Sequence, residues 1–116
     1  MNSLLTVVFA LTSLFHTALK SSIPAKGSTG ASPAAVSLTF TESINVKLTT
    51  IAITKADSSV VESLVVPTGP AAETVGAKVT KALAAGKYLI KWKTASDDGH
   101  VVRGVVPFTV SAAAPH

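Results

Sequence analysis

GKYLIKWKTASDDGHVVRGVVPFTV, residues 86–110, is the most regular part of the chain. In its first half Tyr88, Ile90 and Trp92 stand at alternate positions and share one face of an extended backbone, while three lysines and Leu89 share the other face. The polar run SDDGH then interrupts the pattern, and apolar residues return at alternate positions up to Val110. The stretch predicts two β-strands, each with one buried face, joined by a polar turn.

Upstream of residue 86, shorter segments carry the same kind of pattern. Residues 36–41 alternate strictly, and residues 60–66 form a strand candidate that ends at a Pro- and Gly-rich turn. Residues 44–54 predict a single strand with a bulge or kink where the period of two breaks. Residues 75–83 are ambiguous between a helix and a short strand leading into a loop, and residues 20–33 predict an extended segment followed by turns.

Six or seven short strands in about a hundred residues predict an all-β fold, an antiparallel β-sandwich. The 116 residues suffice for one domain. The absence of Cys excludes disulfide scaffolds, thiolate metal sites and lipoprotein anchors. A net charge of +4, with scattered lysines and a single Trp and Tyr, does not provide a nucleic-acid surface.

Residues 1–15 are uncharged and mostly apolar, which is typical of the apolar region of a secretory signal peptide. The run is shorter than the roughly 20 residues of a membrane-spanning helix. Cleavage would leave His16 as the first residue, although Phe15 stands where a signal peptidase prefers a small side chain, so a cut several residues away stays open. A buried strand or helix is the alternative. Residues 111–116 predict a flexible tail.

The turn between the last two strands holds the chemistry-bearing side chains. Asp98 and His100 lie two residues apart, so in an extended backbone both would project to one side and could bind one cation. Asp97 competes with Asp98 for this role, and the two-residue spacing favours Asp98. A solvated turn with an exposed histidine is the alternative interpretation.

His16 adds two nitrogen donors if it becomes the first residue. Its α-amine, with a pKa of about 8, and its imidazole could chelate one metal ion together. Several nitrogen donors with one carboxylate suit Cu(II), which binds most tightly in the divalent series.

Three blocks of sequence resemble the CopC-type periplasmic copper-binding proteins. They are HTALKSSIPAKGS at residues 16–28, VSLTFTE at residues 36–42, and the stretch at residues 86–110. The resemblance implies a Greek-key sandwich or barrel, immunoglobulin-like or cupredoxin-like, over residues 16–110. It also implies that Cu(II) binds His16, Asp98 and His100, with Glu42 close to the amine.

The expected function is therefore a non-enzymatic periplasmic protein, acting as a monomer, that sequesters Cu(II) or passes it to a CopD-like inner-membrane partner. Some family members hold Cu(I) in a Met-rich segment, but the only Met here is Met1, so a single Cu(II) site is expected. Two alternatives are a copper monooxygenase with a histidine brace and a metal-free immunoglobulin-like interaction module.

Overall fold

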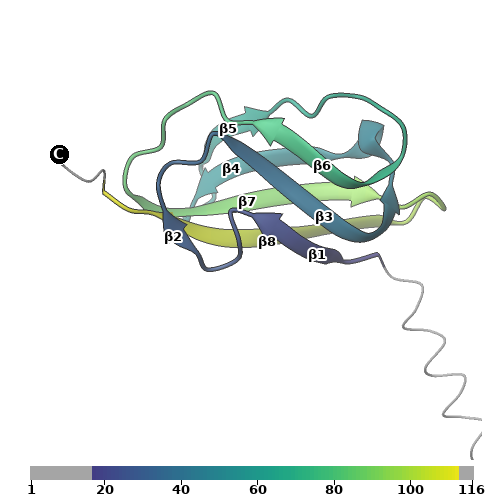
Figure 1. The fold of residues 1–116 in the computed structure, drawn as a ribbon, viewed down its shortest axis with the longest axis horizontal. Helices are drawn as coiled ribbons and strands as arrows, with labels where there is room; N and C mark the ends of the chain where they lie inside the picture. Colours follow the sequence, from purple (N-terminus) through teal and green to yellow (C-terminus); the bar gives the residue numbers. More distant parts are fainter. Residues whose placement is uncertain (1–16, 113–116) are drawn as a thin grey trace, which may run out of the picture.

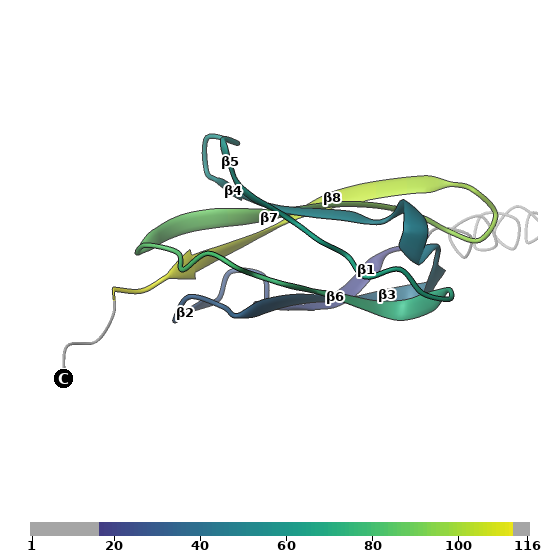
Figure 2. The same cartoon turned by 90° about the horizontal axis from the view of Figure 1, so that it is seen from above.

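The computed structural model describes residues 17–112, which form two β-sheets packed face to face (Figure 1, Figure 2). The three-stranded sheet has the order β1-β3-β6, and the five-stranded sheet has the order β2-β8-β7-β4-β5. The strands are β1 (Leu19–Ile23), β2 (Thr29–Gly30), β3 (Ala35–Ile44), β4 (Thr50–Lys55), β5 (Val60–Leu64), β6 (Ala72–Lys78), β7 (Gly86–Ala95) and β8 (Val101–Val110). The predicted all-β sandwich is confirmed.

All strand pairs are antiparallel except β2 and β8, which pair in parallel over two residues of each strand. The longest pairing joins β7 and β8 from Gly86–Val110 to Ala95–Val101. This ten-residue register explains why residues 86–110 carry the clearest sequence pattern: each strand has one face on the core and one toward solvent.

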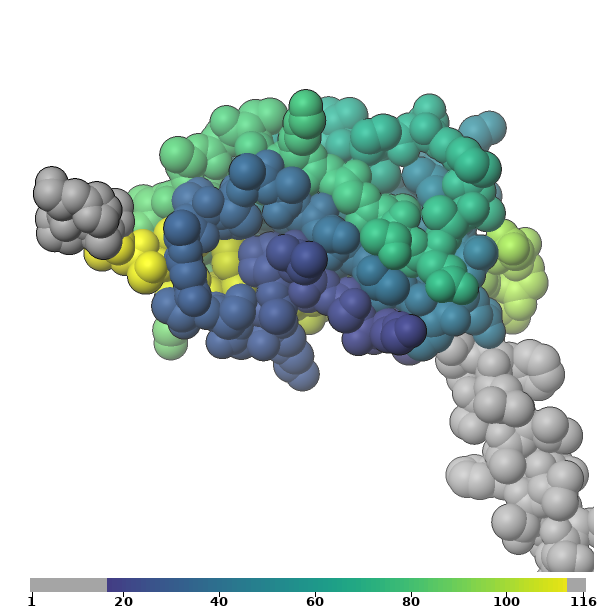
Figure 3. Space-filling view, viewed as in Figure 1, coloured from purple at the N-terminus to yellow at the C-terminus, as the bar shows by residue number. Residues whose placement is uncertain are grey.

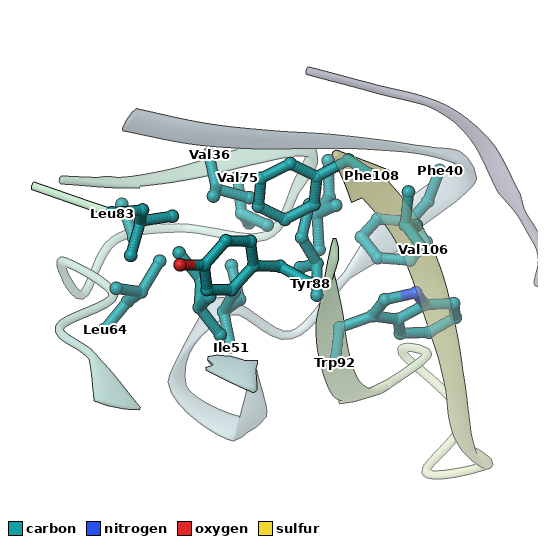
Figure 4. Close-up of a cluster of buried hydrophobic side chains, with 14 of the residues drawn as sticks. Val36, Phe40, Ile51, Leu64, Val75, Leu83, Tyr88, Trp92, Val106 and Phe108 are labelled. Carbon is teal, nitrogen blue, oxygen red and sulfur yellow. The ribbon is translucent and has the colours of Figure 1, made fainter. Parts of the chain in front are cut away.

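The core lies between the two sheets and contains the alternate residues of the predicted strands (Figure 4). Phe40 of β3 meets Trp92 of β7 edge to face, with ring centroids 5.1 Å apart. Tyr88 and Phe108 stack at 5.7 Å, and the Tyr88 hydroxyl donates a 2.6 Å hydrogen bond to the carbonyl oxygen of Ala84. Such aromatic pairs add directional packing to the burial of apolar surface.

Upstream, the structure corrects one prediction and resolves one ambiguity in favour of a short strand that leads into a loop. Residues 44–54 are not one bulged strand: β3 ends at Ile44, the 3-10 helix η2 (Val46–Leu48) follows, and β4 begins at Thr50. The Asn45 side chain accepts a 3.1 Å hydrogen bond from the Lys47 backbone N–H, which caps η2 and stops the strand. Within the ambiguous residues 75–83, the first four belong to β6, and Leu83 is buried in the loop beyond it.

Residues 1–16 and 113–116 lie outside the described part of the chain, so the predicted signal peptide, His16 and most of the predicted tail lie there too. Residues 17–112 contain no helix with the length and apolar character needed to cross a membrane.

Candidate metal centre

Asp98 and His100 meet in the turn between β7 and β8. His100 Nδ1 lies 3.0 Å from Asp98 Oδ2, and the His100 backbone N–H donates a 3.2 Å hydrogen bond to Asp98 Oδ1. The Ser96 hydroxyl donates to the same Oδ1 atom. The structure therefore brings Asp98, the residue that spacing favoured over Asp97, into contact with the His100 imidazole.

The reason for the contact differs from the prediction. Asp97 and Asp98 lie in a hydrogen-bonded turn, not in an extended strand. The turn closes through Gly99, whose backbone N–H donates to the Ser96 carbonyl at 2.9 Å and whose φ of 89° suits a glycine. The two side chains therefore converge because the chain folds back, and Ser96 is a positioning residue that the spacing argument missed.

The hydrogen bonds to Asp98 favour its charged form. The Ser96 hydroxyl and then the His100 backbone N–H lower the pKa of the Asp98 carboxyl below its usual value. Asp98 is 61% exposed and His100 78% exposed, so both side chains can be reached from solvent. The contact occupies Nδ1 of the imidazole, and the geometry leaves Nε2 as the ring nitrogen that can bind a cation.

Glu42, on β3, contacts the first residue of the described chain. Its Oε1 atom accepts a 3.2 Å hydrogen bond from the hydroxyl of Thr17, the residue that follows His16. Beside it, Ala18 and Thr41 exchange two hydrogen bonds: the Ala18 N–H donates to Thr41 Oγ1 at 3.0 Å, and the Thr41 N–H donates to the Ala18 carbonyl at 2.9 Å. These long-range contacts were not visible in the sequence, because no periodicity connects residues so far apart.

The end of β3 also contacts the end of β7. Ile44 forms an antiparallel bridge with Ser96, and the Asn45 backbone N–H donates a 2.8 Å hydrogen bond to the Ala95 carbonyl. The Thr17–Glu42 contact and the turn at residues 96–100 consequently lie at the same end of the sandwich (Figure 1, Figure 3). Ser96 thus links the end of β3 to the turn that carries Asp98 and His100.

Within residues 17–112 no three His, Asp or Glu side chains gather closely enough to hold a metal ion. The Asp98–His100 pair would therefore need donors from elsewhere, and His16, the predicted source, lies outside the described residues. His16, Asp98 and His100 stay a predicted ligand set, with Glu42 as the predicted neighbour of the amine.

Taken together, the fold and this end of it define a small β-sandwich domain that presents a carboxylate–imidazole pair on a turn, close to where its first strand begins. Residues 19–111 match the family model described as the CopC domain, and the chain belongs to this family. The resemblance found in the sequence is thereby confirmed.

Relatives agree with this assignment. Copper resistance protein C from Pseudomonas syringae pv. tomato is 34% identical over 101 residues, which cover 82% of this chain and 80% of the relative. The crystal structure of CopC from Methylosinus trichosporium OB3b is similar with a TM-score of 0.77 and 25% identity, covering 87% of this chain and 99% of that one. PcoC, a methionine-rich copper resistance protein from Escherichia coli, gives a TM-score of 0.67 at 30% identity, covering 83% of this chain and 99% of that one.

Proposed function

We propose that this protein is a copper carrier that binds one Cu(II) ion outside the cytoplasmic membrane and sequesters it or passes it to a membrane partner. Membership of the CopC family and the relatives named copper resistance proteins support copper as the cargo. The observation that carries the proposal is the Asp98–His100 pair, which lies at the same end of the sandwich as Thr17, the residue that follows His16.

The proposed ligands are the α-amine and imidazole of His16, the carboxylate of Asp98 and the imidazole of His100. This set contains three nitrogen donors and one anionic oxygen donor, which matches the tetragonal preference of Cu(II). His100 would bind through Nε2, because Nδ1 faces Asp98. Glu42, held by the residue next to His16, would accept a hydrogen bond from the amine and orient it.

Each described residue has a definite task in this scheme. The turn from Ser96 to His100 holds the carboxylate and imidazole close together before the ion arrives, which reduces the ordering cost of binding. Like any aspartate, Asp98 is ionised at neutral pH, and the hydrogen bonds that lower its pKa further stabilise the charged form, so no proton competes with the ion there. Exposure of both side chains allows the ion to enter and leave without a large rearrangement.

A carrier is proposed instead of an enzyme because the anionic Asp98 ligand stabilises Cu(II) over Cu(I) and occupies a position that oxygen activation would need. A second site for Cu(I) is not proposed, since Met1 is the only thioether in the sequence and would leave with the leader. Redox-linked transfer between two sites of this chain is therefore not part of the mechanism.

The proposal also assigns a place to each part of the chain. Residues 1–15 act as a signal peptide that directs the protein to the periplasm, residues 16–110 form the copper-binding domain, and residues 111–116 form a flexible tail. A CopD-like inner-membrane protein would receive the ion from the monomeric carrier. The uncharged apolar composition of the first fifteen residues supports the export step.

Titration of the purified protein beginning at His16 with Cu(II) tests the site. We expect one tightly bound ion, and we expect Asp98→Asn to weaken its binding by about tenfold to a hundredfold. Asp97→Asn is the matched control, because it removes the same charge from the neighbouring residue and should leave the affinity nearly unchanged. Equal losses in the two variants would contradict a specific role for Asp98, and unchanged binding in both would place the copper site elsewhere.

A further inference from the structure

The outward face of β7 and β8 carries a compact group of cations, Lys91, Lys93 and Arg103. Lys93 is paired directly with Arg103 across the two strands, and Lys91 lies one row further along. All three project away from the core, because the alternate positions of β7, including Trp92, are buried. Lys93 and Arg103 are both exposed.

Like charges placed directly opposite each other on a sheet destabilise it. No carboxylate offsets this pair, since the one side-chain ion pair within residues 17–112 joins Asp98 and His100. Four of the six carboxylates in the sequence, those of Glu42, Asp57, Glu62 and Asp98, make hydrogen-bonding contacts elsewhere in the molecule. The structure therefore retains a costly arrangement of charge that its own folding does not require.

The cations line a groove of about 710 Å³, and its lining also includes Ala52 of β4 and Val105 of β8. Ser63 and Leu64 of β5 line it as well, so the groove extends across four neighbouring strands of the five-stranded sheet. Lys91 donates a 2.8 Å hydrogen bond across this face to the hydroxyl of Ser58 in the β4–β5 turn. The groove is thus lined by both cationic and apolar side chains.

We propose that this groove, the β7–β8 groove, is the docking surface for an extended acidic segment of a partner protein. Lys91 and Lys93 are two residues apart on one strand, a separation of about 6.6 Å. An extended peptide that carries Asp or Glu at every second position presents its carboxylates on one face at the same interval. Charge complementarity of this kind gives specificity and speeds association.

The mixed lining argues for a polypeptide, because a peptide can offer acidic side chains to Lys93 and Arg103 and apolar atoms to Ala52 and Val105, whereas lipid headgroups offer charge alone. A second copy of the chain fits less well, since each copy has a net charge of +4. The groove contains no residue of the proposed copper ligand set. The docking proposal is therefore independent of the proposed function, and each can be contradicted without the other.

The test measures binding of a fluorescein-labelled peptide of four Asp-Val repeats to the full processed protein by fluorescence anisotropy. We expect saturable binding that weakens as salt increases. The double variant Lys93→Gln/Arg103→Gln should lose about tenfold or more in affinity. The control variant Lys26→Gln/Lys78→Gln loses the same charge from other surfaces and should change binding by less than about twofold.

Thermal melts of the variants show whether each one folds, and removal of the opposed charges should not lower the melting temperature. Equal weakening in the two double variants would overturn the proposal, because the peptide would then respond only to net charge. The absence of saturable peptide binding would overturn it as well. Phosphatidylserine vesicles provide the last arm: if they bind through Lys93 and Arg103 while the peptide does not, the surface contacts a membrane and the acidic-segment proposal is wrong.

Discussion

Gly104 of β8 lies against the indole of Trp92, its direct partner on β7. A Cβ atom added at Gly104 would come within 2.5 Å of Trp92 Cζ2 and 2.8 Å of Cε2, which is closer than non-bonded carbon atoms approach. The indole Nε1 atom is buried and has no hydrogen-bond partner within residues 17–112. The indole packs against Phe40 and against Gly104. Because Nε1 makes no hydrogen bond there, this packing fixes the orientation of the ring.

Gly104→Ala should consequently destabilise the protein by about 1–3 kcal/mol, because the added methyl group forces the indole and its neighbours to move. Chemical denaturation measures the loss, and the emission of Trp92, the only tryptophan, reports the movement of the ring. Gly69→Ala is the control, since a Cβ there meets no atom within 4 Å. A Gly104→Ala protein with unchanged stability and emission would show that the ring is free to shift.

The residues of the candidate site show what spacing alone can predict. Spacing favoured Asp98 over Asp97 as the partner of His100, and the structure brings these two side chains together. The turn that does so depends on Gly99 and on the Ser96 hydroxyl, which alternation rules do not consider. Spacing could not predict the contact of Thr17 with Glu42, because the two residues lie on different segments of the chain, and only the family resemblance implied that Glu42 lies near residue 16.

At the level of elements, β7 and β8 were predictable because both have one buried and one exposed face. The break after Ile44 was not predictable, because a local hydrogen bond from the Lys47 N–H to the Asn45 side chain competes with continuation of the strand. For β6 the alanines favour a helix by intrinsic propensity, and pairing with β3 overrides that preference. The parallel contact of β2 with β8 is too short to leave a pattern in sequence.

Glu62 connects two elements that belong to different sheets. It lies on β5, and its carboxylate accepts hydrogen bonds from the Thr80 hydroxyl at 2.6 Å, from the Thr80 N–H at 3.0 Å and from the Lys81 N–H at 3.1 Å, just beyond β6. The Thr80 side chain and then the Thr80 N–H lower the pKa of Glu62 below its usual value. The ionised carboxylate therefore holds the edge of the five-stranded sheet to the chain that leaves the other sheet.

A lowered pKa in the folded state means that Glu62 stabilises the protein above its unfolded pKa, and that this contribution disappears as pH falls through the folded pKa. Glu62→Gln should therefore lower the melting temperature at pH 7, and the difference from the unsubstituted protein should shrink as the pH falls below the ordinary glutamate range. Circular dichroism melts across this pH range measure the effect. Glu73→Gln, on the exposed side of β6, is the control. A pH-independent difference would contradict the role of the charge.

For the whole molecule, the contacts of Thr17 and Ala18 fix where the chain emerges from the sandwich. Thr17 is buried and bonded to Glu42, while Ala18 pairs with Thr41. The proposed copper site combines His16, next to Thr17, with the turn that follows β7. It therefore depends on the fold bringing together residues more than eighty positions apart in the sequence. A site of this kind forms only when the sandwich is complete, which couples ion binding to global folding.

The first residue provides the sharpest test of that arrangement. One alanine added ahead of His16 moves the α-amine by about 3.8 Å along the chain and separates it from the imidazole. Because Thr17 and Ala18 are anchored by their own hydrogen bonds, the melting temperature should not change, whereas Cu(II) affinity should fall by more than about tenfold. Intact mass establishes each starting residue, and competition with a chelator measures the affinity. An alanine added after His116 is the control and should have no effect. If the protein extended ahead of His16 holds Cu(II) as tightly as the protein that begins there, the amine is not a ligand, and the ion must be bound by side chains alone.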